Sequence, residues 1–242
     1  MIRSIATLDL EQPSSLPTPL PKPLPKPIPK PILVGICGGS CSGKTTVAQK
    51  IYEMLCPHSR VAIVSQDNFY RCLPEGVDPH NYDFDDPHAL DLEALYDCLQ
   101  QLHVGHGLPV SIPQYDFVTH SRMDAVQWIP QSEFVIVEGI HVFYLPKIRD
   151  LFDLRIFVKA DGDTMLYRRL LRDEQERGRQ VKDILDQYTR YVKPSYEKFV
   201  KPMECHATII IPNNQNNRLF TGTELVGRYL LGEFLYPLPR AI

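Results

Sequence analysis

The chain has 242 residues, a formal net charge of −3 and a hydrophobic fraction of 43%. That length fits one large α/β domain or two small ones, and the mildly acidic balance disfavours a dedicated nucleic-acid-binding protein. No apolar run is long enough to span a membrane, and the first residues do not resemble a signal or transit peptide. The six cysteines form no CxxC pair, so we expect a reduced, cytoplasmic setting and no structural zinc site.

Residues 1–31 are expected to form a proline-rich arm. Proline occupies every second position from Pro17 to Pro31. Because each proline fixes φ and lacks an N–H, this segment cannot join a sheet or a helix. We expect a disordered, solvated arm of polyproline II character, and its PxxP spacings leave an SH3-like partner as the alternative.

The folded domain is expected over residues 32–242. Short β-branched apolar runs are predicted to be strands buried on both faces of a parallel sheet; they span residues 32–37, 61–66, 134–139, 154–160 and 207–212. Helical patterns alternate with them, at residues 45–55, 90–103, 163–176, 181–200 and 224–235. We expect Asp163 or Thr164 to cap the third helix, and a break in the fourth before Pro194.

Residues 105–130 depart from this alternation. Apolar and polar residues alternate there with few helix signals, which predicts a β-hairpin or a small antiparallel extension of the sheet.

The first predicted strand is followed by Gly38, Gly43, Lys44 and Thr45, which match GxxxxGK[ST] and lead into a predicted helix. A row of backbone N–H groups can hold a polyphosphate there, because small residues leave the backbone accessible. Lys44 would reach the β- and γ-phosphates, and the Thr45 hydroxyl would bind Mg²⁺. The alternative is a glycine-rich turn with a chance lysine. The predicted phosphate-binding residues are Gly38, Gly39, Ser40, Cys41, Ser42, Gly43, Lys44, Thr45 and Thr46.

With this motif, the alternation of strands and helices predicts an α/β P-loop NTPase fold. We expect three layers around a mainly parallel five-stranded sheet, with the hairpin and an arginine-rich lid over residues 165–193 as additions.

Two acids follow predicted strands at the edge of the sheet where ligands bind in such folds. Glu138 ends one apolar strand, where a Mg²⁺ ion is its natural partner and a cap at Gly139 is the alternative. Asp67 follows another strand and could accept a proton from an attacking hydroxyl, or only form a turn. Both interpretations of Asp67 stay open on this evidence.

Two later segments combine acids with aromatic rings, NYDFDDP (81–87) and PQYDFVTHSR (113–122). An Asp can accept both hydroxyls of a ribose, aromatic faces can sandwich a base, and a His can hydrogen-bond the edge of the base. Taken singly, the aromatic residues are more often ordinary packing residues.

The segment YRRLLRDEQERGRQ (167–180) is rich in arginine. Arg169 and Arg172 share one helical face, and Arg177 and Arg179 flank Gly178 as in a mobile lid. Such charge runs are more often solvated helix faces. Beside a nucleotide site, however, these arginines would neutralise charge on the moving phosphoryl group and exclude water.

Taken in chain order, these blocks resemble the uridine kinase family, specifically the uridine-cytidine kinases. The similar blocks are GGSCSGKTT, SQDNFY, FDDPHALD, IPQYDFVTHSR, VEGI, DLRIFV, RRLLRDEQERGR and QYTRYVKP. The resemblance implies phosphoryl transfer from ATP or GTP, with Mg²⁺, to the 5′-hydroxyl of uridine or cytidine in pyrimidine salvage. It also implies a homo-oligomer, commonly a tetramer, and often inhibition by CTP or UTP.

The resemblance also implies a role for each matching position. Asp67, together with Lys44, would be catalytic, and Thr45, Glu138 and Asp67 would serve the metal. Arg172 and Arg177 would meet the triphosphate. The remaining positions would bind the nucleoside: Asp85 with Arg169, Arg179 and Gln187 at the ribose, and Tyr115, His120, Phe84, Phe117 and Tyr70 around the base.

Three departures from the family pattern are visible. Asp86 stands where the family often has the histidine of FDHP, and a second acid there could raise the pKa of Asp85 by like-charge repulsion. Cys41 stands where alanine is common. The late strand continues as IPNNQNN (211–217) rather than with the family's arginine and glycine.

Two alternative functions remain. A related P-loop kinase could use another acceptor, as phosphoribulokinase-like and pantothenate kinase-like proteins do, although the hairpin with Tyr115 and His120 favours a base. A weakly active nucleotide-binding regulator is the other alternative, against which the set of Lys44, Thr45, Asp67 and Glu138 argues.

Overall fold

The computed structural model describes residues 30–104, 108–214 and 216–232. The predicted proline-rich arm therefore lies outside the described residues, apart from Lys30 and Pro31. Within the described ranges, no helix combines the length and the apolar character that crossing a bilayer requires.

A five-stranded parallel sheet forms the centre of the fold, in the order β2, β5, β1, β6, β7. Its strands are β1 (Ile32–Gly38), β2 (Val61–Ser65), β5 (Phe134–Gly139), β6 (Leu154–Lys159) and β7 (Ile209–Pro212). Each adjacent pair is parallel. The central strands are buried almost throughout, as expected of branched apolar strands covered on both faces. The predicted α/β fold with its five strands is confirmed.

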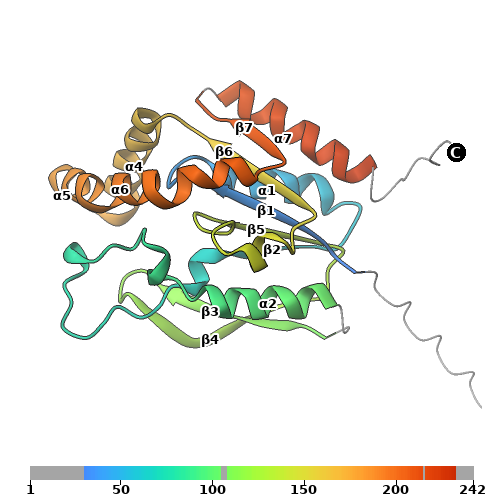
Figure 1. The fold of residues 1–242 in the computed structure, drawn as a ribbon, viewed down its shortest axis with the longest axis horizontal. Helices are drawn as coiled ribbons and strands as arrows, with labels where there is room; N and C mark the ends of the chain where they lie inside the picture. Colours follow the sequence, from blue (N-terminus) through green and yellow to red (C-terminus); the bar gives the residue numbers. More distant parts are fainter. Residues whose placement is uncertain (1–29, 105–107, 215, 233–242) are drawn as a thin grey trace, which may run out of the picture.

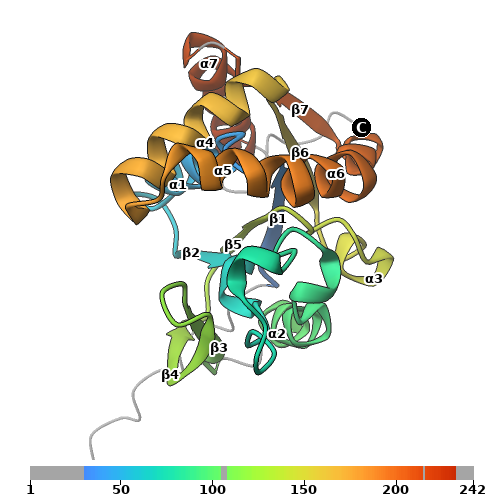
Figure 2. The same cartoon turned by 90° about the vertical axis from the view of Figure 1, so that its left-hand side faces the viewer.

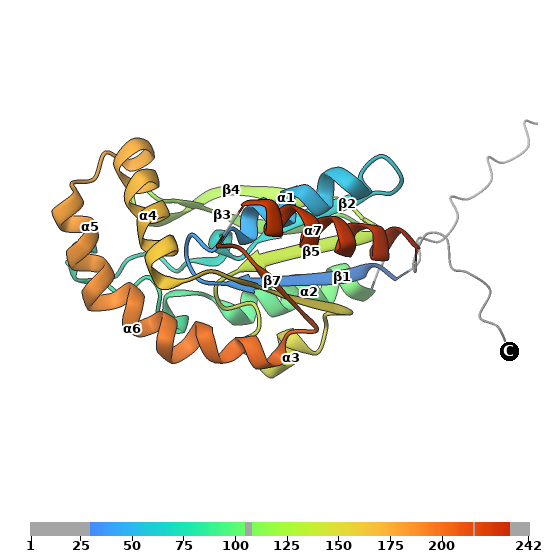
Figure 3. The same ribbon diagram turned by 90° about the horizontal axis from the view of Figure 1, so that it is seen from above.

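Helices and the hairpin cover the two faces of this sheet as separate layers. Side chains of alternate parity on β1, such as Val34 and Ile36, pack with α1 (Lys44–Leu55) and α7 (Asn216–Leu230). Leu33 and Cys37 face the opposite way and pack with α2 (Leu92–Val104). Figure 1 shows α1 and α7 on one face and α2 on the other, and Figure 3 shows α1 and α7 side by side over the strands.

Residues 110–129 form the predicted hairpin. It consists of β3 (Val110–Asp116) and β4 (Ser121–Ile129), which pair antiparallel with an irregularity between Pro113 and Tyr115. Val110, Ile112 and Tyr115 are buried and join the same apolar cluster as the inner face of α2. The alternating pattern therefore gives β3 one face that packs and one that is exposed, whereas the middle of β4 is exposed on both faces.

The segment after β6 is more continuous than the sequence predicts. It contains α4 (Gly162–Arg177), α5 (Val181–Gln187) and α6 (Lys193–Ser195), with π-helical turns at Tyr188–Val192 and Tyr196–Val200. The predicted break before Pro194 is wrong. In the π-helical turn the Lys193 N–H donates to the carbonyl of Tyr188, five residues back, and this wider turn leaves room for the proline ring.

Two predicted helix starts also need correction, and one short helix, α3 (Pro146–Arg149), was not predicted. The N-cap of α4 is Asp161, not Asp163 or Thr164, and its carboxylate accepts a hydrogen bond from Asn214 Nδ2. The last helix begins at Asn216 rather than near residue 224. Its buried stripe includes Leu219, one turn before Thr223, so the amphipathic face starts earlier than the polar sequence there indicates.

The carboxyl ends of the parallel strands meet at one end of the molecule. Figure 2 looks onto this end and shows α4, α5 and α6 on one side of it. The loop that precedes α2 and the hairpin lie on the other side. Ligands bind at this edge in open α/β sheets.

Candidate active site

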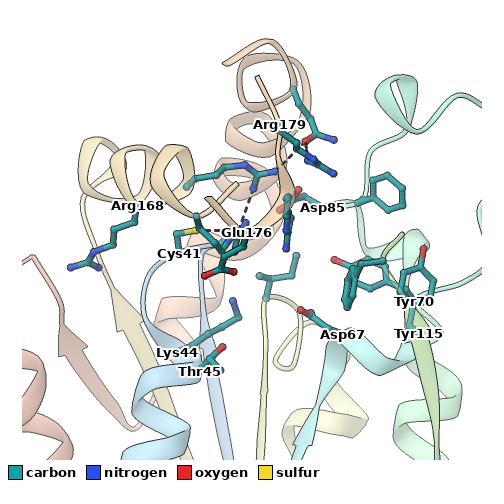
Figure 4. A pocket seen from close by; sticks show the side chains of 18 of the residues that line it. Cys41, Lys44, Thr45, Asp67, Tyr70, Asp85, Tyr115, Arg168, Glu176 and Arg179 are labelled. Carbon is teal, nitrogen blue, oxygen red and sulfur yellow. Dashed lines mark hydrogen bonds between the residues drawn. The ribbon is translucent and has the colours of Figure 1, made fainter. Parts of the chain in front are cut away.

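A cavity of about 780 Å³ opens at the carboxyl end of the strands, within the volume range of small-molecule sites. In Figure 4, Lys44 and Thr45 reach in from one side, Asp67, Tyr70 and Tyr115 from the other, and Arg179 from above. The cavity brings together most of the residues predicted to form the site: Ser40, Cys41, Gly43, Lys44, Thr45, Thr46, Asp67, Tyr70, Phe84, Asp85, Tyr115, Phe117, His120, Arg169, Arg172, Arg177, Arg179 and Gln187.

The other predicted residues, Gly38, Gly39, Ser42 and Glu138, lie behind this lining. Ser42 is fully buried, and its N–H donates to the carbonyl of Gly39 at 3.0 Å. A Cβ on Gly39 would lie 2.7 Å from the sulfur of Met165. Gly39 and Ser42 therefore set the path of the loop between β1 and α1. Other residues of the loop, Ser40, Cys41 and Gly43, face the cavity.

Gly43 has a left-handed backbone, with a φ of 97°. Asn213 donates from Nδ2 to the carbonyl of Ser42 at 2.6 Å, and this amide fills the space that a Cβ on Gly43 would need. Lys44 then begins α1, so the open N–H groups of the helix start face the cavity. The loop can hold an anion through its backbone.

A buried carboxylate lies beneath Lys44. Glu138 accepts hydrogen bonds from Thr45 Oγ1 at 3.3 Å and from Ser65 Oγ at 2.8 Å, and it is 5% exposed. Burial raises the pKa of Glu138, while the charge of Lys44 lowers it. Ser65 Oγ in turn accepts the N–H of Asp67 at 3.4 Å. The hydroxyl of Thr45 and the carboxylates of Glu138 and Asp67 are the hard oxygen ligands that Mg²⁺ prefers, so the residues present fit that ion.

Asp67 lies in a 3-10 turn, η1 (Gln66–Phe69), directly after β2. The preceding residue, Gln66, is fully buried and accepts the N–H of His141 through Oε1 at 2.8 Å. The turn is thereby fixed to the end of β5, and the Asp67 side chain faces the cavity opposite Lys44 (Figure 4).

Asp85 lines the cavity from the loop that precedes α2. Burial raises the pKa of Asp85, and the charges of Arg169 and Lys44 lower it. The like charge that adds to the effect of burial is that of Asp67, rather than that of Asp86 as expected. The Asp86 carboxylate instead accepts hydrogen bonds from His88, which lower the pKa of Asp86 against the opposing effect of burial.

Aromatic side chains form the wall beyond Asp67 and Asp85. Phe84 and His120 stack with ring centroids 4.9 Å apart, and Tyr70 and Tyr115 lie 5.4 Å apart. Phe117 lies edge-on to Tyr115 at 5.1 Å. The rings come from three separate segments, and together they make an apolar surface with polar edges.

Arg122 fixes the hairpin to the turn that carries Asp67. Its Nε donates to the carbonyl of Tyr70 at 3.0 Å, and its Nη2 donates to the carbonyl of Phe69 at 3.3 Å. The same guanidinium pairs with Asp91 at 3.2 Å. The sequence did not single out Arg122.

Arginines of α4 and of the segment after it close the other side of the cavity. Arg169 donates to Ser40 Oγ and to Gln187 Oε1, both at 3.3 Å, and Arg179 donates to the same Gln187 oxygen at 3.0 Å. We call Arg169, Arg172, Arg177 and Arg179 the arginine cluster.

Sequence reasoning also missed Asp173, His141 and Asn213. Asp173 is hidden within an arginine-rich charge run, although an acid at that place in the run is a visible signal. His141 donates from Nε2 to the carbonyl of Asp85 at 2.7 Å, and nothing in the local sequence indicates that contact. The same holds for Asn213, because its partner Ser42 is distant in the chain.

Comparisons with known proteins agree with this architecture. The structure resembles the crystal structure of a putative fructose transport system kinase from Silicibacter sp. TM1040, with a TM-score of 0.60 at 18% identity over 77% of this chain and 92% of that one. The chain is 43% identical to "Uridine-cytidine kinase 2-B" of Danio rerio over 72% of this chain and 70% of that protein. It is 42% identical to "Uridine/cytidine kinase UKL1, chloroplastic" of Arabidopsis thaliana, over 73% of this chain but only 36% of that protein.

The sequence profile of one protein family matches most of the folded region. The match covers residues 33–219, from the first strand into the last helix, and includes every segment that lines the cavity. The chain belongs to the phosphoribulokinase / uridine kinase family.

Proposed function

We propose that this protein transfers the terminal phosphoryl group of ATP or GTP to the 5′-hydroxyl of uridine or cytidine, giving UMP or CMP. The observation that carries the proposal is a single cavity with a phosphate-binding loop on one side and an aromatic wall with Asp85 on the other. The names of the Danio and Arabidopsis relatives support a uridine or cytidine acceptor.

The donor is held by the loop and the arginines. Backbone N–H groups at the start of α1 bind the phosphates, Lys44 meets their terminal oxygens, and Arg172 and Arg177 approach from α4. Thr45, Glu138 and Asp67 would hold Mg²⁺, which supplies positive charge to the phosphate oxygens when it is bound. Fixed charges that stabilise the transferring group are the main source of catalysis in such reactions.

The acceptor is held by the aromatic wall. The Asp85 carboxylate accepts hydrogen bonds from the ribose hydroxyls, with Arg169, Arg179 and Gln187 beside it. For the base, Tyr115 and His120 supply polar edges, while the rings of Phe84, Phe117 and Tyr70 provide packing surface.

Asp67 lies between the two groups of residues. In the proposed step its carboxylate accepts the proton of the 5′-hydroxyl while the hydroxyl oxygen forms its bond to the γ-phosphorus. The bond from that phosphorus to the bridging oxygen breaks, and the nucleoside diphosphate leaves with the electron pair.

A panel of acceptors tests the proposal. The full chain is incubated with Mg-ATP or Mg-GTP and, separately, with uridine, cytidine, adenosine, ribulose 5-phosphate and pantothenate, and nucleoside diphosphate release is measured. We expect turnover with uridine and cytidine. Turnover only with ribulose 5-phosphate or pantothenate would place the protein in another branch of the family, and nucleotide binding without any turnover would favour a regulator.

Assembly and location are further parts of the proposal. We expect a homo-oligomer, a tetramer by resemblance, which light scattering of the purified chain would test. We expect a cytoplasmic location, which microscopy of a tagged full-length protein would compare with the chloroplast named for the Arabidopsis relative. An SH3-like partner for the proline-rich arm would be tested by calorimetry with such a domain.

A further inference from the structure

Asp173 is a fully buried acid at the centre of the arginine cluster. It lies on α4 and is 0% exposed. All members of the cluster form ion pairs with its carboxylate, at 2.8 Å for Arg172, 3.4 Å for Arg177, 3.6 Å for Arg169 and 3.8 Å for Arg179. A buried carboxylate surrounded in this way fixes where the guanidinium groups can lie.

The two carboxylate oxygens divide the cluster into pairs. Oδ1 faces Arg172 and Arg177, the arginines assigned above to the triphosphate. Oδ2 faces Arg169 and Arg179, which also share Gln187 and are assigned to the nucleoside. One side chain therefore touches the groups that serve both substrates.

The two carboxylate oxygens of Asp173 differ in how strongly they hold their arginines. Oδ1 accepts a hydrogen bond from Arg172 Nε at 2.9 Å, whereas within the described residues Oδ2 has no hydrogen-bond partner. When the triphosphate draws Arg172 and Arg177 towards its own oxygens, more of the carboxylate charge is left to attract Arg169 and Arg179. There is room for that pair to approach, because both contacts to Oδ2 are longer than 3.5 Å.

We infer that Asp173 is a positioning residue that couples the donor and acceptor subsites, so that binding of the nucleoside triphosphate tightens binding of the nucleoside. Coupling between sites is reciprocal, so the nucleoside raises the affinity for the triphosphate by the same factor. The inference rests on the proposed function for the identity of the acceptor.

Calorimetry measures this coupling without turnover. Uridine is titrated into the full chain with and without Mg²⁺ and a non-hydrolysable ATP analogue, and the ratio of the two dissociation constants is the coupling factor. We expect a factor of about 10 in the unmodified protein, within the usual range for coupled sites. A factor of 1 in the unmodified protein overturns the inference.

Asp173→Asn is the informative variant, because it keeps the shape and Oδ1 but places an amide NH₂ against the guanidinium groups of Arg169 and Arg179. We expect its coupling factor to fall to about 1 and kcat/KM for uridine to fall about 10²-fold, since displaced contacts of this kind have effects of that size. Asp173→Glu keeps the charge but lengthens the side chain and displaces the carboxylate, so it should recover a factor above 1 but below that of the unmodified protein. A wild-type factor in Asp173→Asn overturns the inference.

Glu174→Gln is the matched control. Glu174 is the next residue on α4 and is exposed, and its substitution by Gln removes one negative charge, as Asp173→Asn does. It should keep the coupling factor of the unmodified protein, and loss of coupling in this variant would assign the effect to the overall charge of the helix and overturn the inference. If thermal unfolding shows that Asp173→Asn does not fold, Asp173→Glu decides alone: a factor below that of the unmodified protein supports the inference, and an unchanged factor overturns it.

Failure of the inference is distinguishable from failure of the proposed function. If uridine and cytidine are not phosphorylated, the proposed function fails, and the coupling factor is measured with the acceptor that the panel identifies. If uridine is phosphorylated and Asp173→Asn behaves as the unmodified protein does, only the inference fails.

Discussion

The two sides of the cavity are built in different ways. The phosphate side is mainly backbone, a loop of small residues between β1 and α1 whose path is set by its own buried Ser42 and by the neighbouring Asn213. The nucleoside side is made of the side chain of Tyr70, which follows the η1 turn, and of side chains from the loop before α2 and from the hairpin. A backbone site depends on one contiguous motif, whereas the aromatic wall depends on how distant segments pack.

This difference predicts that substitutions on the two sides separate the two substrates. A change in the loop should affect the triphosphate, and a change in the aromatic wall should affect the nucleoside. A residue at the boundary should affect the chemical step itself.

Asp67 lies at that boundary, and its substitution should have the largest effect. In Asp67→Asn we expect kcat to fall about 10³-fold, because the amide cannot accept the proton of the attacking hydroxyl. Steady-state kinetics measures kcat, and calorimetry should show that ATP binding is retained. The exposed Asp124→Asn on β4 is the control. An unchanged kcat would remove Asp67 as the base.

Gly43→Ala tests the backbone side. The backbone at this position is left-handed, a conformation that residues with a Cβ disfavour, and the new Cβ would overlap the Asn213 amide. The loop must therefore shift. We expect the affinity for ATP to fall about 10²-fold while uridine affinity without nucleotide is unchanged. Gly76→Ala is the control, since that glycine also has a positive φ, 77°, but open space around it. Equal losses for both substrates would break the comparison.

His141 tests the support behind the nucleoside side. Burial lowers the pKa of His141 from 6.5 to about 4, so between these values the unfolded chain binds a proton that the folded protein does not. Stability should therefore fall as the pH falls from about 6.5 to about 4, by up to about 3 kcal/mol from this group.

Denaturant unfolding at pH 7.5 and pH 5 measures this dependence. The unmodified protein should lose more stability between the two pH values than His141→Leu does, and the exposed His58→Asn should behave as the unmodified protein. An identical pH dependence in the His141→Leu variant would contradict a buried neutral imidazole at this position.

Phe84→Leu should have the smallest effect. It removes the ring that stacks on His120 but keeps an apolar side chain. We expect KM for uridine to rise about fivefold and KM for ATP to stay unchanged, as one aromatic contact contributes about 1 kcal/mol. Phe220→Leu, at an exposed position on α7, is the control. A parallel rise in KM for ATP would show that the two sides are not separate.

The sequence predicted the parallel strands, the phosphate loop and the hairpin because each is a local pattern. The predictions from sequence were wrong where contacts between distant residues determine the structure. The π-helical turn that accommodates Pro194 and the early start of α7 both depend on packing rather than on local propensity. For the site, the individual roles came from the resemblance, and contacts such as those of Asp173 with four arginines require the folded chain.

Arg122 limits how the specificity of this protein can be engineered. Exchanging the hairpin for one from a relative is an obvious way to change the preferred base, since the hairpin pairs only with itself among the described strands. A graft that lacks this guanidinium would leave the carbonyl of Tyr70 without its side-chain donor and the carbonyl of Phe69 with the Asp91 N–H in place of two donors. The transplanted segment could then misalign the reactive carboxylate two residues upstream of Phe69, and so turn a change in selectivity into a loss of turnover.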